Sequence, residues 1–190
     1  MISENVLPFK LERTNEKLTA HAGLLIGHEF HVGLGLPALL DVRLPPPGSN
    51  RGYAPSEVIL PLVLMLQGGG DDLEDIGVIA GDEALCEAAG FESVPDATTL
   101  GAWMRRFARY GMSGLAAVSD RLTEVRYEPL ARTEHVLDVD PTIIEAHKQD
   151  ATRAYDGTMG YRPVLGFLAD TRWLLHEEFR TGSASAQANA

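Results

Sequence analysis

The chain has 190 residues, 45% hydrophobic and 23% charged, which is ordinary for a globular protein and sufficient for one sizeable domain or two small ones. Its formal net charge of −11 argues against a general nucleic-acid-binding protein, because phosphate contacts need lysine and arginine. With one cysteine, no basic and apolar leader, and no apolar stretch near the roughly 20 residues of a membrane helix, we expect a cytoplasmic protein.

The first part of the chain is predicted to be helical. Residues 21–40 have a helix-like apolar spacing that several glycines weaken. The proline run 45–47 excludes both a helix and a central strand, so it marks a break. After it, Ser56 is a suitable N-cap for a buried helix over 57–67, and the glycines 68–70 end that helix.

Short helices are predicted next. Asp71 or Asp72 caps a helix that runs to about residue 80, and residues 82–89 form another helix that stops at Gly90. A longer helix starts near 95–98, with its apolar side chains on one face, and a further helix runs over 113–125.

The helix that starts near residue 95 carries Arg105, Arg106 and Arg109 outside its apolar face. Residues 101–134 hold six arginines and four acids, a local balance of +2 in an acidic chain. Short helices followed by an arginine-bearing helix are typical of a helix-turn-helix, in which these three arginines would contact DNA phosphates. A helical bundle with an exposed arginine-rich helix explains the same pattern.

The last part of the chain is predicted to form strands at 135–140, 163–169 and 173–180, with a hairpin turn at 169–172. Three strands without a covering helix make an incomplete domain, because a sheet needs a second layer. We therefore predict an α+β chain with a helical domain over 1–130 and an incomplete second domain over 131–190.

Asp138 and Asp140 are the strongest candidates for chemistry. They alternate with Leu137 and Val139, so a strand places both carboxylates on one face. Two neighbouring carboxylates repel each other unless a cation neutralises them, and a divalent metal is a suitable cation. The alternative is that these acids only end a strand and cap the turn at Pro141.

Taken in chain order, several segments resemble bacterial insertion-sequence transposases with a DDE catalytic domain. The clearest is Leu137-Asp138-Val139-Asp140-Pro141-Thr142. The other segments are residues 7–12, 51–57, 68–70, 72–75, 82–85, 98–107, 160–163 and 179–182.

The resemblance implies a second domain that is the start of an RNase-H-like catalytic domain, with a first strand and a β-hairpin. It implies that Asp140 is the first catalytic acid, with Asp138 beside it, and that the acids hold Mg²⁺ for phosphodiester cleavage and strand transfer. The helical domain would bind the terminal inverted repeats of the element, and the protein would then be associated with the nucleoid. It would form a homodimer or pair with a full-length transposase.

The chain departs from the family pattern in its acids. The second and third catalytic acids belong on elements beyond the hairpin, and neither Asp170, in the turn, nor Glu177 and Glu178, on the third strand, replaces them. We therefore expect a truncated transposase that is inactive alone. The alternative is a non-catalytic DNA-binding or inhibitory module derived from a transposase.

Overall fold

The computed structural model describes residues 5, 6, 9, 10, 13–49, 51–110, 112–127 and 134–184, without the side chains of 5, 6, 9, 10, 108–110, 126 and 127. The chain divides into two compact units, Met1–Ser119 and Asp120–Ala190. Helices precede antiparallel sheets, so the predicted α+β class is confirmed. The predicted domain boundary at 130 falls in residues 128–133, outside the described residues, and stays a prediction.

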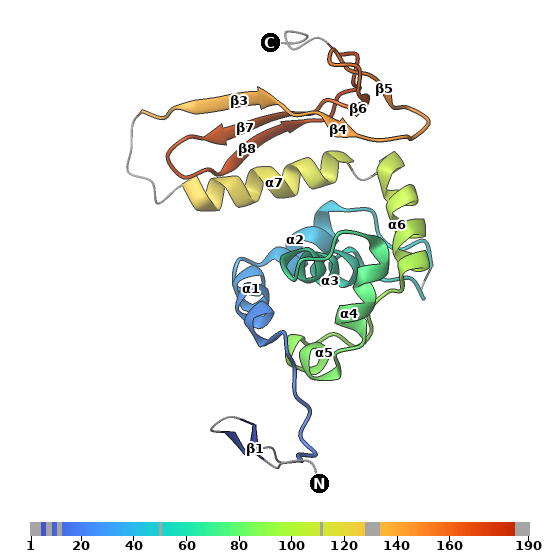
Figure 1. The fold of residues 1–190 in the computed structure, drawn as a ribbon, viewed down its shortest axis with the longest axis vertical. Helices are drawn as coiled ribbons and strands as arrows, with labels where there is room; N and C mark the ends of the chain where they lie inside the picture. Colours follow the sequence, from blue (N-terminus) through green and yellow to red (C-terminus); the bar gives the residue numbers. More distant parts are fainter. Residues whose placement is uncertain are drawn as a thin grey trace. The chain divides into compact units, whose positions relative to one another are not determined.

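The first unit contains a pair of two-residue strands followed by helices (Figure 1). Its elements are β1 (Asn5–Val6), β2 (Phe9–Lys10), α1 (Ala22–Gly33), α2 (Leu36–Arg43), α3 (Pro55–Gln67), the 3₁₀ turn η1 (Leu73–Asp75), α4 (Ile76–Ala80), α5 (Glu83–Ala89) and α6 (Ala97–Tyr110). The helix α7 (Met112–Tyr127) continues into the second unit.

The predicted helical segment 21–40 is two helices. Gly35 separates α1 from α2 with a φ of 71°, a conformation that favours glycine and ends a regular helix. Within the described residues, no single helix is long and apolar enough to cross a membrane. The helices α1 and α2 reach that length and apolar character only when they are taken together, and they are bent by 61° relative to each other.

The helix α3 begins two residues earlier than Ser56 would allow as an N-cap, so that prediction is wrong. Ala54 is the N-cap, and its backbone amide donates to the carboxylate of Glu57 over 2.7 Å. The amide and hydroxyl of Ser56 both donate to Asp41, over 2.8 and 2.9 Å. The side chain of Ser56 therefore joins α3 to α2 and does not cap its own helix.

Aspartates start three of the following segments, and the first of them, Asp72, is one of the two predicted caps. Asp72 accepts hydrogen bonds from the amides of Glu74 and Asp75, over 3.1 and 3.3 Å, at the start of η1. Asp82 accepts from the amide of Leu85 over 2.9 Å at the start of α5. Asp96 accepts from the amide of Thr99 over 2.8 Å at the start of α6. Each carboxylate satisfies an amide that the helix leaves without an internal partner.

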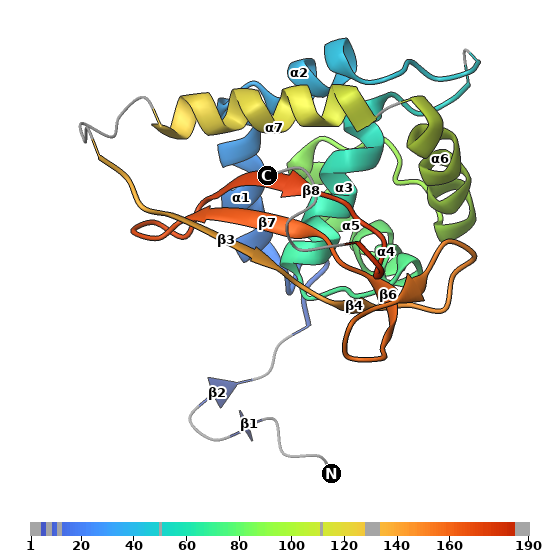
Figure 2. The same ribbon diagram turned by 90° about the horizontal axis from the view of Figure 1, so that it is seen from above.

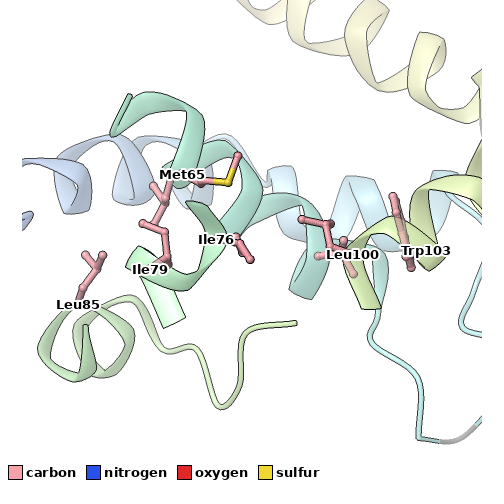
Figure 3. Close-up of a cluster of buried hydrophobic side chains, with 8 residues drawn as sticks. Met65, Ile76, Ile79, Leu85, Leu100 and Trp103 are labelled. Carbon is pink, nitrogen blue, oxygen red and sulfur yellow. The ribbon is translucent and has the colours of Figure 1, made fainter. Parts of the chain in front are cut away.

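One hydrophobic cluster holds these helices together (Figure 3). The helices α3, α4, α5 and α6 all contribute buried side chains to it. They are Val58, Leu64, Met65, Ile76, Ile79, Leu85, Leu100 and Trp103. Since Leu100 and Trp103 belong to this cluster, α6 is fixed on its apolar side and its remaining faces point away from the core.

The second unit contains two three-stranded sheets (Figures 1 and 2). In the first, β7 (Val164–Leu168) lies between β3 (Leu137–Pro141) and β8 (Leu174–Glu178), and all pairs are antiparallel. This arrangement contains the predicted strands and the predicted hairpin. Along β7 buried and half-buried residues alternate, so one face of the sheet is more covered than the other.

The second sheet occupies a segment for which the sequence predicts no strand. Its strands are β4 (Ile144–Glu145), β6 (Met159–Tyr161) and β5 (Thr152–Arg153), paired in that order. Figures 1 and 2 both place β4 and β6 beyond the Pro141 end of β3. Strands of two or three residues are too short to give a periodic apolar pattern, so the sequence does not signal them.

Close backbone contacts join the second sheet to the residues after β8. The amide of Gly182 donates to the carbonyl of Gly160 over 3.1 Å, and the amide of Arg162 donates to the carbonyl of Arg180 over 2.8 Å.

A Cβ atom at Gly160 would lie 2.0 Å from the carbonyl oxygen of Ile144. The strands β4 and β6 therefore approach each other as closely as only a glycine allows.

Candidate functional site

The register of β3 places Asp138 and Asp140 on the same face of the first sheet. Asp138 is opposite Phe167 of β7, and Asp140 is opposite Leu165. Residues two apart on a strand point to the same side, and their Cα atoms are about 7 Å apart. Both side chains are exposed. The structure thus brings the two predicted acids together in an accessible position.

The same face carries one more acid at a distance. Glu177 of β8 pairs with Leu165, which pairs with Asp140, so Glu177 is two strand spacings from Asp140, about 10 Å. Within the described part of the chain, no group of three or more histidine, cysteine, aspartate or glutamate side chains could hold a metal ion. The face therefore offers two adjacent carboxylates.

Two carboxylates fit one magnesium ion. Mg²⁺ is commonly held by one or two carboxylates, with water and substrate phosphates completing its coordination. Asp138 and Asp140 are oxygen donors of this kind, and neither side chain is buried against other groups. The pair does not by itself provide the ligands of a two-metal site.

The arginines on α6 differ in their surroundings. The side chain of Arg105 is exposed and that of Arg106 is half-buried, while that of Arg109 lies outside the described residues. A Cβ atom at Gly48 would lie 3.0 Å from Nη1 of Arg106, so Arg106 lies against the proline-containing loop 44–49. Among the described residues, neither Arg105 nor Arg106 forms an ion pair.

Two further arginines flank the same loop, and the sequence alone does not single them out. Arg43, at the end of α2, and Arg51 are both exposed. Neither forms an ion pair with a described carboxylate. The proline run 45–47 signals a break in the chain, but nothing in its composition signals that the loop lies against α6.

Acidic side chains gather at α5 and contact the segment before α1. Lys17 contacts Glu87 over 2.9 Å and Glu83 over 3.7 Å. Asp82 accepts a hydrogen bond from the hydroxyl of Thr19 over 2.5 Å, and Nδ1 of His21 lies 3.1 Å from the same carboxylate oxygen. The hydrogen bond from Thr19, followed by that from the amide of Leu85, lowers the pKa of Asp82. These contacts attach the segment before α1 to α5.

The comparisons with known proteins add one finding to this geometry. The model of the family described as transposase DDE domain group 1 matches residues 6–190, which is nearly the whole chain. No curated protein and no solved structure was found to match.

Proposed function

We propose that this chain, which belongs to the transposase DDE domain group 1 family, contributes a catalytic carboxylate pair and a DNA-binding helical unit to DNA transposition. The placement of Asp138 and Asp140 on one exposed face of β3 is the observation that carries the proposal. The motifs that this chain shares with bacterial insertion-sequence transposases support its assignment to an insertion sequence. The terminal inverted repeats of that element would be the DNA that the chain binds.

Asp140 is proposed as the main metal ligand and Asp138 as its neighbour. Like charges on one face repel, and a divalent ion held by the two carboxylates would remove that repulsion. In the family such ions activate the attacking oxygen and stabilise the leaving oxygen of a phosphodiester. The two aspartates would hold and orient the ion on an exposed face that DNA can approach.

We also propose that the chain alone does not cut DNA. A DDE site uses three carboxylates and two ions, whereas β3 supplies two adjacent carboxylates and Glu177 is about 10 Å from Asp140. The chain would then act as a DNA-binding or inhibitory module that pairs with an active transposase or with itself.

The metal proposal is tested by titrating Mn²⁺ into the chain and measuring free ion by electron paramagnetic resonance. We expect Asp140→Asn to weaken binding about ten-fold or more, since one of two charged ligands is removed, and Asp138→Asn to weaken it less. Asp150→Asn, which changes an exposed acid elsewhere in the same unit, is the matched control and should bind as the parent does.

Two results would contradict these proposals. Unchanged Mn²⁺ binding by Asp140→Asn would remove the assigned metal site. Strong Mg²⁺-dependent cleavage of DNA by the parent chain, lost in Asp140→Ala, would overturn the proposal that the chain is inactive alone.

The DNA-binding proposal depends on Arg105, Arg106 and Arg109. Replacing all three with alanine should weaken binding to repeat DNA and flatten the plot of log K against log salt, by about 0.9 for each phosphate that is no longer neutralised. Arg121→Ala is the control, because Arg121 already pairs with Glu124 over 2.8 Å. Equal salt dependence of the triple variant and the parent would exclude these arginines as phosphate ligands.

A further inference from the structure

A cleft lies between α6 and the proline-containing loop 44–49. Its volume is about 210 Å³, and it is lined by Pro45, Pro46, Trp103, Arg106 and Phe107. All five residues belong to the first unit. The metal proposal does not use this cleft, and of its lining residues the DNA-binding proposal uses Arg106 alone.

The spacing of the α6 residues builds one wall. Residues three and four apart on a helix share a side, so Trp103, Arg106 and Phe107 line the cleft together. The Trp103 and Phe107 rings stack with centroids 4.8 Å apart and an interplanar angle of 12°. Trp103 is only 9% exposed and belongs to the hydrophobic cluster, so this wall is firmly anchored.

The loop builds the other wall. Proline fixes φ and has a rigid ring, so Pro45 and Pro46 form an apolar surface that does not collapse into the gap. Arg106 closes one side, where its guanidinium lies against Gly48. A side chain at position 48 would displace that guanidinium, because its Cβ atom would be 3.0 Å from Nη1.

The chemistry of the lining selects for a flat and anionic ligand. Four of the five lining residues are apolar or aromatic, and the fifth is a cation that forms no ion pair among the described residues. Arg43 and Arg51 add two exposed positive charges at the two ends of the loop.

We propose that this cleft binds one unpaired nucleobase of a DNA strand, with the adjacent phosphate on Arg106. The inference rests on the proposed DNA-binding function and gives it a specific site. A base has an apolar face that fits between aromatic and proline rings, and its phosphate supplies a negative charge to Arg106. The bases of an intact duplex are stacked and paired, so only an unpaired base can enter.

The test compares three probes in the Trp173→Phe background, where Trp103 is the remaining tryptophan. The probes are an oligothymidylate, an abasic oligonucleotide of equal length with the same phosphates, and a duplex. We expect oligothymidylate to quench the fluorescence of Trp103 and to bind about ten-fold more tightly than the abasic strand, as stacking of one base on an aromatic wall predicts.

Two variants separate the base from the phosphate. Phe107→Leu keeps an apolar side chain but removes a ring, and should abolish the preference for oligothymidylate over the abasic strand. Arg106→Ala should lower the affinity for oligothymidylate and for the abasic strand by the same factor, because both strands carry the phosphate. Thermal unfolding by circular dichroism verifies that each variant is folded.

The outcomes distinguish this inference from the proposed function. Equal affinity for oligothymidylate and the abasic strand, or a preference for oligothymidylate that survives in Phe107→Leu, would overturn the base-binding cleft. Binding of the duplex in the same experiment would still support the proposed DNA-binding function. Absence of binding to all three probes at low salt would overturn the DNA-binding function, and the cleft with it.

Discussion

Replacing Gly160 with alanine is expected to lower the free energy of unfolding of the Asp120–Ala190 unit by about 3 kcal/mol, the upper end for overpacking. The new Cβ atom would lie 2.0 Å from the carbonyl oxygen of Ile144 and 2.9 Å from its carbonyl carbon. Both are backbone atoms, so relief requires β4 and β6 to separate. Urea unfolding monitored by circular dichroism measures the change.

Gly166→Ala is the matched control for this prediction. Gly166 is also buried in a strand of the same unit, but a Cβ atom there would lie 3.4 Å from the Cβ atom of His176, which is an ordinary distance. The nearest backbone atom, the carbonyl oxygen of His176, would be 3.8 Å away, so we expect a change in the free energy of unfolding within about 1 kcal/mol. Similar losses of stability in the two variants would show that the β4–β6 approach is not the cause.

Replacing Asp82 with alanine is expected to lower the free energy of unfolding of the Met1–Ser119 unit by about 2 kcal/mol at pH 7. The variant loses the cap of α5 and the hydrogen bond from Thr19 together. The Asp82 side chain is only 11% exposed, so water replaces these partners poorly. Asp96→Ala, which loses the single cap bond to Thr99 at an exposed site, should cost about half as much.

The contribution of Asp82 depends on pH in a definite direction. Its pKa in the folded chain lies below the ordinary value of 3.8, first because of the hydrogen bond from Thr19. Stabilisation by such a carboxylate is complete above the pKa of the unfolded chain and is lost as pH falls through the pKa of the folded chain. The difference between parent and Asp82→Ala should therefore shrink below about pH 4. A constant difference between pH 7 and pH 3 would contradict this explanation.

The helices of the first unit could be predicted because their signals are local. Asp72, Asp82 and Asp96 each cap an element that begins within one or two residues, and Gly90 ends α5 with a φ of 72°. Ser56 misled the prediction because its partner, Asp41, belongs to another helix. The motif order along the chain predicted a transposase with a DDE domain, and the family match confirms the family.

The elements that could not be predicted depend on contacts between distant residues. The strands β4, β5 and β6 are too short for a pattern, and the glycine at 160 acquires its meaning only next to Ile144. The alternation around Asp138 and Asp140 predicted one shared face, whereas their role as metal ligands stays a prediction. The approach of the loop at Gly48 to Arg106 joins residues 58 positions apart, and no local pattern encodes it.

The strand β3 also has a consequence for the behaviour of the protein at high concentration. In the described part of the chain β3 pairs with β7 alone, and Val136, Leu137 and Val139 are 65%, 53% and 53% exposed. Such an edge is a template for association between copies. The charges of Asp138 and Asp140 oppose in-register association, because they would lie beside the same charges of a second copy. A divalent ion held by this pair, as proposed above, would cancel that repulsion, so we expect magnesium to favour aggregation of the protein and a chelator to oppose it.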